Sequence, residues 1–91
     1  MSLVHKNIVI RGRVQGVYFR ASAKYKADQL EVKGMIKNES DGSVFAAAEG
    51  EDEVVASFIE WCRTGPPAAK VIGVEISDGQ IQGYKSFDVI R

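Results

Sequence analysis

The order of the periodic segments along this 91-residue chain constrains its fold more than any other feature. Short stretches in which β-branched residues cluster, or apolar and polar residues alternate, are typical of strands. Such stretches lie at residues 7–14, 33–39, 43–49, 69–76 and 86–90. Segments with a helical period follow the first and the third of these stretches. The sequence therefore predicts the order β-α-β-β-α-β with a short strand at the end.

An apolar stripe at helical spacing identifies each helix. The first helix begins at Phe19, and its stripe consists of Phe19, Ala23, Ala27 and Leu30. The second stripe consists of Val54, Val55, Phe58, Ile59 and Cys62. Residues 50–53, which include three carboxylates, are expected to form the first turn of the second helix, where negative charge favours the positive end of the helix dipole. Gly65, followed by two prolines, predicts its end.

This order of elements predicts an α+β, ferredoxin-like split-βαβ sandwich, with a mixed, mainly antiparallel sheet and two helices on one face. We expect one domain over residues 1–91. Because each βαβ crossover is right-handed, the first two strands should run parallel, with the third strand antiparallel between them. The carboxyl ends of the first two strands then meet at one edge of the sheet. Residues 15–20 and Asn38 are therefore expected to lie close together.

The net charge of zero conceals a division along the chain. Up to Lys37, eight basic residues face two acidic ones, and from Asn38 onward four basic residues face ten acidic ones. The first part therefore carries +6 and the second −6, which is compatible with an anion site in the first part or with attraction between neighbouring elements. No apolar run approaches the roughly 18 residues of a membrane span. A single cysteine excludes an internal disulfide and a cysteine-based zinc site, so we expect a cytoplasmic protein.

Residues 15–20 join the end of a predicted strand to the start of a predicted helix. The first turn of a helix presents free N–H groups and the positive end of its dipole, which together attract anions. Gly16 gives the backbone the freedom for a close approach to an anion, and the planar guanidinium of Arg20 matches two phosphate oxygens. The same residues are equally compatible with a plain connecting turn and a solvated arginine.

Two segments resemble the signatures of one family. Residues 10–20, Ile-Arg-Gly-Arg-Val-Gln-Gly-Val-Tyr-Phe-Arg, resemble the first signature of the acylphosphatase family at every specified position. Residues 34–38, Gly-Met-Ile-Lys-Asn, resemble the second signature, which continues through Gly42, Val44 and Gly50. Met35 and Ile36 replace the usual aromatic and small residues there. The similarity extends through Gly65, Pro66 and Val71 to residues 87–90.

The resemblance implies a ferredoxin-like enzyme that hydrolyses small acylphosphates to carboxylate and inorganic phosphate, without a metal or a cofactor. By motif position, Arg20 is similar to the phosphate-binding arginine and Asn38 to the residue that orients the attacking water. The phosphate cradle is implied to be the backbone of Gln15, Gly16, Val17, Tyr18, Phe19 and Arg20. We expect a monomer that binds no nucleic acid and no membrane.

The chemistry of acylphosphates agrees with these residue types. The leaving group is a carboxylate, whose conjugate acid has a pKa near ~4, so it departs at neutral pH without a general acid. Phosphoryl transfer through a loose transition state needs chiefly positioning and electrostatic stabilisation. An arginine, a ring of amides and a water-orienting side chain supply both.

Two other functions share this element order. RNA-recognition domains stack bases on aromatic residues of such a sheet, but the third strand, residues 43–48, lacks their basic-Gly-aromatic core motif. A non-catalytic regulatory domain is the other alternative, and Arg20 and Asn38 count against it.

The side chains of several other residues are expected to have simpler roles. His5 is expected to be an exposed terminal residue, and Cys62 a small buried apolar residue. Phe58 and Trp61 are expected in the core. Tyr18 occupies an unspecified position of the motif and is expected at the mouth of the site.

Overall fold

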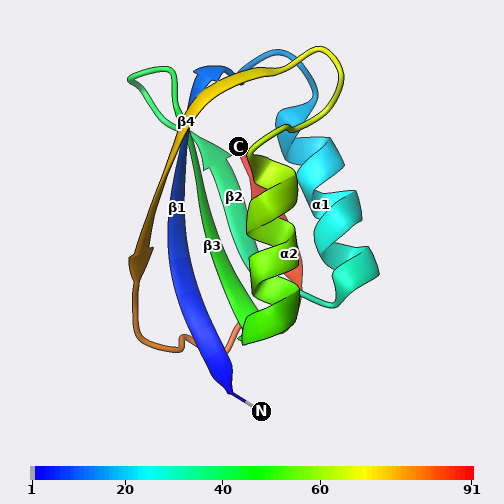
Figure 1. The fold of residues 1–91 in the computed structure, drawn as a ribbon, viewed down its shortest axis with the longest axis vertical. Coiled ribbons are helices and arrows are strands. Elements are labelled where there is room, and N and C mark those ends of the chain that lie inside the picture. Colours follow the sequence, from blue (N-terminus) through cyan, green and yellow to red (C-terminus); the bar gives the residue numbers. More distant parts are fainter. Residues whose placement is uncertain (1) are drawn as a thin grey trace.

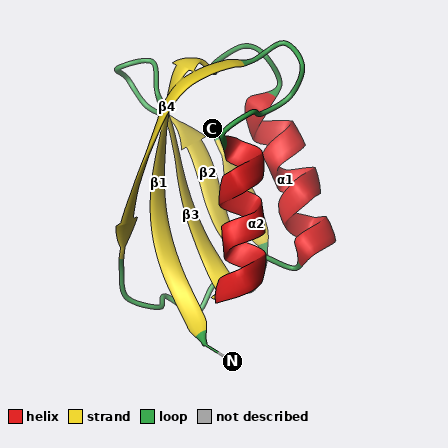
Figure 2. Ribbon diagram, in the orientation of Figure 1, coloured by secondary structure: helices red, strands yellow, loops and turns green. Residues whose placement is uncertain are grey.

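The computed structural model describes residues 2–91 and contains five strands and two helices. In chain order the elements are β1 (Leu3–Arg13), α1 (Phe19–Leu30), β2 (Lys33–Asn38), β3 (Val44–Glu51), α2 (Asp52–Cys62), β4 (Lys70–Asp78) and β5 (Phe87–Ile90). The two helices lie side by side on one face of the sheet (Figures 1 and 2). The predicted α+β, ferredoxin-like fold is confirmed.

The strand order in the sheet is β4-β1-β3-β2-β5. Strand β3 pairs antiparallel with both β1 and β2, so β1 and β2 run in the same direction, as predicted. Strand β4 pairs antiparallel with β1, and β5 pairs parallel with β2. The carboxyl ends of β1 and β2 therefore share one edge of the sheet, which lies at the top of Figure 1 beside the amino end of α1. We call this the site edge.

The core lies between the sheet and the two helices. Alternate residues of the central strands face the helices, as the two-residue period of a strand requires. These buried strand residues are Ile8, Ile10, Ile36, Val44, Ala46 and Ala48. They meet the predicted helix stripes, of which Phe19, Ala23, Ala27, Val55, Phe58, Ile59 and Cys62 are buried. Each large apolar side chain buried in this way contributes roughly 1.5–3 kcal/mol to stability.

The ends of three elements differ from the prediction. Strand β1 begins at Leu3 rather than residue 7, because residues 3–6 pair with residues 48–51 of β3. Gly50 and Glu51 belong to the end of β3 rather than to the helix, and only Asp52 and Glu53 supply acidic groups to the first turn of α2. Strand β4 extends to Asp78 through pairing with Lys6. Pairing between strands extends these elements beyond the limits of their local pattern.

The expectation of an exposed His5 is wrong. The residue is 6% exposed, and Nδ1 donates a hydrogen bond of 2.7 Å to the Glu49 carboxylate. The connection between β4 and β5 covers this pair, because Glu49 also accepts hydrogen bonds from the backbone N–H groups of Gln82, Gly83 and Tyr84. Residues from β1, β3 and this connection thus form a buried polar cluster at the end of the sheet opposite the site edge.

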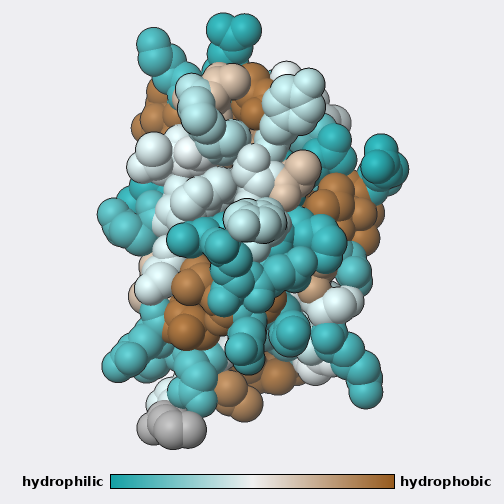
Figure 3. All heavy atoms as spheres, turned by 90° about the vertical axis from the view of Figure 1, so that its right-hand side faces the viewer, coloured by the Kyte–Doolittle hydropathy of each residue, from teal (hydrophilic) through white to brown (hydrophobic). Residues whose placement is uncertain are grey.

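The surface on the side of the two helices is mixed. Apolar patches on this side are separated by hydrophilic side chains (Figure 3). In residues 2–91, neither helix has the length and apolar character needed to cross a membrane.

Candidate active site

The loop between β1 and α1 is built from residues with unusual backbone geometry. Gly16 has φ of 73°, and Tyr18, the residue before the helix, has φ of 65°. Left-handed residues within a turn direct successive N–H groups toward one side of the chain, which makes a concave site for an anion. A Cβ at Gly16 would meet nothing within 4 Å. Glycine is therefore favoured at this position by its backbone conformation and not by lack of space.

The backbone N–H groups of this loop have no hydrogen-bond acceptor in the described part of the chain. The first hydrogen bond of helix α1 runs from Ser22 N–H to the carbonyl of Tyr18 at 3.0 Å. Within residues 2–91, no acceptor is recorded for the N–H groups of residues 16–21. The first turn of α1 contains no acidic residue, and Tyr18 makes no side-chain cap. These donors and the positive end of the helix dipole together form a site suited to a tetrahedral anion.

Arg20 is half-buried beside this loop, and its Nη1 donates a hydrogen bond of 3.2 Å to the carbonyl of Ile90 in β5. A cavity of about 610 Å³ opens here. It is lined by Val14, Gly16, Tyr18, Phe19, Arg20, Ala21, Lys24, Val89 and Arg91, of which three are basic and none is acidic. Two of the eight basic residues in the first part of the chain, Arg20 and Lys24, therefore lie at the cavity, together with Arg91 from the second part.

The cradle residues fall into two groups. Gly16, Tyr18, Phe19 and Arg20 line the cavity, whereas Gln15 and Val17 do not. The side chains of Val17 and Phe19 are buried in the core, so these two residues present only backbone groups to an anion. Tyr18 is 81% exposed at the rim of the cavity.

Asn38 is the last residue of β2 and lies on the same face of the sheet as the buried Ile36, two residues earlier. Its side-chain oxygen Oδ1 is buried and has no hydrogen-bond partner within residues 2–91. The preceding residue, Lys37, pairs with Ile90, whose carbonyl accepts the hydrogen bond from Arg20. Asn38 does not line the cavity, but the fold brings it to the same edge of the sheet as Arg20.

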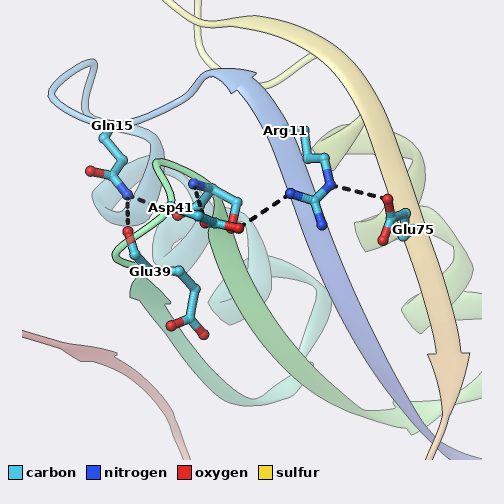
Figure 4. A network of polar contacts seen from close by, with 6 residues as sticks. Arg11, Gln15, Glu39, Asp41 and Glu75 are labelled. Atoms are coloured by element: carbon cyan, nitrogen blue, oxygen red, sulfur yellow. Dashed lines mark hydrogen bonds and ion pairs between the residues drawn. The ribbon is translucent and has the colours of Figure 1, made fainter.

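The side chain of Gln15 makes a link that the sequence reasoning missed. Its Nε2 donates two hydrogen bonds of 2.8 Å, to the carbonyls of Glu39 and Ser43 in the hairpin between β2 and β3 (Figure 4). No pattern in the sequence indicates this link, because the partners are backbone carbonyls 24 and 28 residues away.

An ion-pair network supports the other side of the same hairpin (Figure 4). Arg11 of β1 bonds Asp41 at 3.3 Å and Glu75 of β4 at 3.0 Å. Hydrogen bonds from the hydroxyl and the backbone N–H of Ser43 hold the pKa of Asp41 below its usual value, and Arg11 adds to this effect. These groups are exposed, so the network orients the hairpin and adds little to stability.

Metal-ligating and nucleophilic side chains are not gathered at the site. Within residues 2–91, no group of three or more histidine, cysteine or acidic side chains is arranged to hold a metal ion. Cys62 is buried in the core, as expected, and burial raises the pKa of its thiol to about 12. The site therefore offers amide donors, a guanidinium and one amide side chain for chemistry.

Comparison with known proteins places most of the chain in one family. The family model described as acylphosphatase matches residues 6–89. A protein of Nocardioides named acylphosphatase is 47% identical over 83 residues, covering 91% of this chain and 84% of its own. A protein of Methylococcus capsulatus, also named acylphosphatase, is 42% identical over 92 residues. The match covers 100% of this chain and 98% of the Methylococcus protein. The crystal structure of acylphosphatase from Bacillus subtilis matches with a TM-score of 0.94 and 33% identity, covering 99% of this chain and all of that one.

Proposed function

The chain belongs to the acylphosphatase family, and from this premise we propose that the site edge hydrolyses acylphosphates through Arg20, Asn38 and the cradle of residues 15–20. The protein is an acylphosphatase. Its substrate is an acylphosphate and its product inorganic phosphate.

In the proposed reaction, a water oxygen attacks the phosphorus atom in line with the bond to the acyl oxygen. The new P–O bond forms as the bond between phosphorus and the acyl oxygen breaks, and the carboxylate leaves with the electron pair. The water loses its protons to the phosphate product and to solvent. The carboxylate needs no general acid, because its conjugate acid has a pKa near ~4. Stabilisation of the phosphoryl group is therefore the main task of the protein.

The unpartnered N–H groups of the loop and of the first turn of α1 support a phosphate cradle. Donors that are already free before the substrate binds stabilise the phosphoryl group without first breaking a hydrogen bond of the protein. Arg20 adds a guanidinium held by the carbonyl of Ile90. With one nitrogen bonded to this carbonyl, the guanidinium keeps donors for two phosphate oxygens.

The buried Oδ1 of Asn38, an acceptor without a partner, is the single observation that most favours the proposed reaction. A buried carbonyl oxygen without a hydrogen bond costs roughly 1–3 kcal/mol, and a donor that binds to it removes this cost. Phosphate oxygens also accept, so they cannot satisfy this atom. A water molecule donates, and a water held by Asn38 would retain a lone pair for attack on phosphorus.

We further propose that the protein acts as one domain and as a monomer in the cytoplasm, without nucleic acid. The apolar patches on the helix side are separated by hydrophilic side chains, which disfavours association through that side (Figure 3). Size-exclusion chromatography with light scattering tests the monomer, and a gel-shift assay with RNA at several salt concentrations tests the absence of nucleic-acid binding.

Hydrolysis of benzoyl phosphate tests the proposed activity. We expect turnover that is unaffected by EDTA and inhibited competitively by inorganic phosphate. An alkyl phosphate monoester is the matched control, and we expect it to remain uncleaved because its alkoxide leaving group needs an acid or a metal. No hydrolysis of benzoyl phosphate would contradict the activity, and loss of turnover in EDTA would contradict the metal-free mechanism.

A further inference from the structure

We propose that Gln15 is a positioning residue, whose side chain holds Asn38 in place and does not bind phosphate. The inference rests on the proposed roles of Asn38 and of the cradle. The backbone of Gln15 belongs to the cradle loop, whereas its side chain reaches the β2–β3 hairpin. One residue thus connects the segment proposed to bind phosphate to the segment that carries the proposed water-orienting side chain.

The geometry of the link defines which atom of the amide makes it. Nε2 lies 2.8 Å from the carbonyl oxygen of Glu39 and 2.8 Å from that of Ser43. Two carbonyl oxygens accept hydrogen bonds, so only the NH₂ end of the amide can face both of them. Its two protons are both used, which orients the side chain toward the hairpin and leaves no donor of Nε2 for a phosphate oxygen.

The two carbonyls belong to the residue pair that closes the hairpin. Glu39 N–H donates to the carbonyl of Ser43 at 2.9 Å. Glu39 follows Asn38 in the chain, and Ser43 precedes Val44, which is the strand partner of Asn38. Gln15 therefore holds the pair of residues next to Asn38, and a shift of the hairpin relative to the cradle would move Asn38 as well.

The other support of the hairpin is weaker. The pair between Arg11 and Asp41 is exposed, at 45% and 56% of the side chains, and its distance is 3.3 Å. Exposed ion pairs are screened by water and salt. The link through Gln15 is part-buried and makes two short hydrogen bonds. Of the two supports, the Gln15 link is the one that starts from the cradle loop.

Substitution of Gln15 by leucine separates positioning from phosphate binding. The Gln15→Leu variant keeps the cradle backbone and removes both hydrogen bonds to the hairpin. We expect kcat for benzoyl phosphate to fall about tenfold or more, because a misplacement of about 1 Å costs up to 10²-fold. We expect the inhibition constant of inorganic phosphate to stay within about twofold of wild type, as for binding that depends on the cradle alone.

A double-mutant cycle with Asn38→Ala tests whether Gln15 acts through Asn38. If it does, adding Gln15→Leu to Asn38→Ala lowers the residual kcat by no more than about twofold, because the side chain being positioned is already gone. Rates of the slow variants are measured at high enzyme concentration and corrected for spontaneous hydrolysis. Gln29→Leu, on the exposed face of α1, is the matched control and should leave kcat unchanged.

Three outcomes would overturn the inference. A rise in the phosphate inhibition constant in step with the fall in kcat would make Gln15 a phosphate ligand. If Gln15→Leu lowers kcat by the same factor in wild type and in the Asn38→Ala variant, Gln15 acts independently of Asn38. An unchanged kcat in the Gln15→Leu variant would show that the side chain of Gln15 has no role in turnover. Wild-type protein without activity would instead contradict the proposed function itself.

Urea unfolding, followed by Trp61 fluorescence, shows which variants are folded before any rate is compared. If Gln15→Leu does not fold, Gln15→Asn takes its place, because a side chain one methylene shorter cannot reach both carbonyls. The same pattern is expected: a lower kcat, an unchanged phosphate inhibition constant, and little further effect when Asn38 is absent. Any other pattern in that variant overturns the inference.

Discussion

Replacement of Glu49 by glutamine should destabilise the protein strongly, although the two side chains have the same shape. Glu49 is 6% exposed. One carboxylate oxygen accepts from the N–H groups of Gly83 at 3.0 Å and Tyr84 at 3.2 Å, and the other accepts from Gln82 and from His5. Glutamine has one acceptor oxygen and one NH₂ group. In either orientation of the amide, at least one backbone N–H group then faces another donor.

The cost follows from the hydrogen bonds that are lost or weakened. A buried N–H group without an acceptor costs about 1–3 kcal/mol, and a bond to a charged group is worth about 1 kcal/mol more than a neutral one. For Glu49→Gln we therefore expect a loss of about 3 kcal/mol in the free energy of unfolding. In a domain of this size, such a loss lowers the melting temperature by roughly 12–24 °C.

Urea unfolding at pH 7, followed by the fluorescence of Trp61, measures this loss. Glu60→Gln is the matched control, because Glu60 is an exposed residue of α2 paired only with Arg63 at 3.5 Å. Exposed pairs of this kind contribute at most about 1 kcal/mol. A loss in Glu49→Gln that is no larger than in the control would refute the anchoring argument.

The pH dependence gives a second measure of the same anchor. Burial by itself raises the pKa of Glu49, but the hydrogen bonds from Gln82, His5, Tyr84 and Gly83 outweigh it, so the pKa lies below its usual value of 4.5. Stability from a lowered pKa is present above the unfolded value and is lost as the pH falls through the folded one. The stability difference between wild type and Glu49→Gln should therefore shrink below about pH 4.5. A difference that stays constant down to pH 3 would contradict the anchor.

Three further substitutions test the proposed site. Arg20→Gln should weaken inhibition by phosphate and lower kcat for benzoyl phosphate by about 10²-fold, the scale of a lost transition-state donor. Arg63→Gln is its exposed control, and near-normal kinetics of Arg20→Gln would remove Arg20 from the mechanism. Asn38→Ala should lower kcat by a similar factor while phosphate still inhibits at its wild-type concentration. Loss of phosphate inhibition in the Asn38→Ala variant would instead identify Asn38 as a direct phosphate ligand. Gly16→Ala should cost about 1–2 kcal/mol in urea unfolding, because φ of 73° is unfavourable for alanine. It should also weaken phosphate inhibition, and unchanged values in both assays would contradict the backbone argument.

Local pattern was sufficient for most of the fold. The helix that begins at Phe19 and the end of α2 before Gly65 follow from spacing and stop signals. The start of β1 could not be predicted from its own residues. Leu3 and the residues that follow join the sheet by pairing with residues near Glu51, and a local window does not contain that partner.

The motifs of residues 10–20 and 34–38, together with the split βαβ order, determined the family, the expected site residues and the edge of the sheet where they meet. Tertiary structure alone decided what each of these side chains, and others elsewhere in the molecule, touches. The Gln15 amide reaches carbonyls 24 and 28 residues away, Asn38 Oδ1 is buried without a partner, and His5 meets Glu49 across 44 residues. These contacts depend on strand register and on the path of the connections, which place distant residues within 3 Å of each other. Periodicity records only which face of its own element a residue occupies.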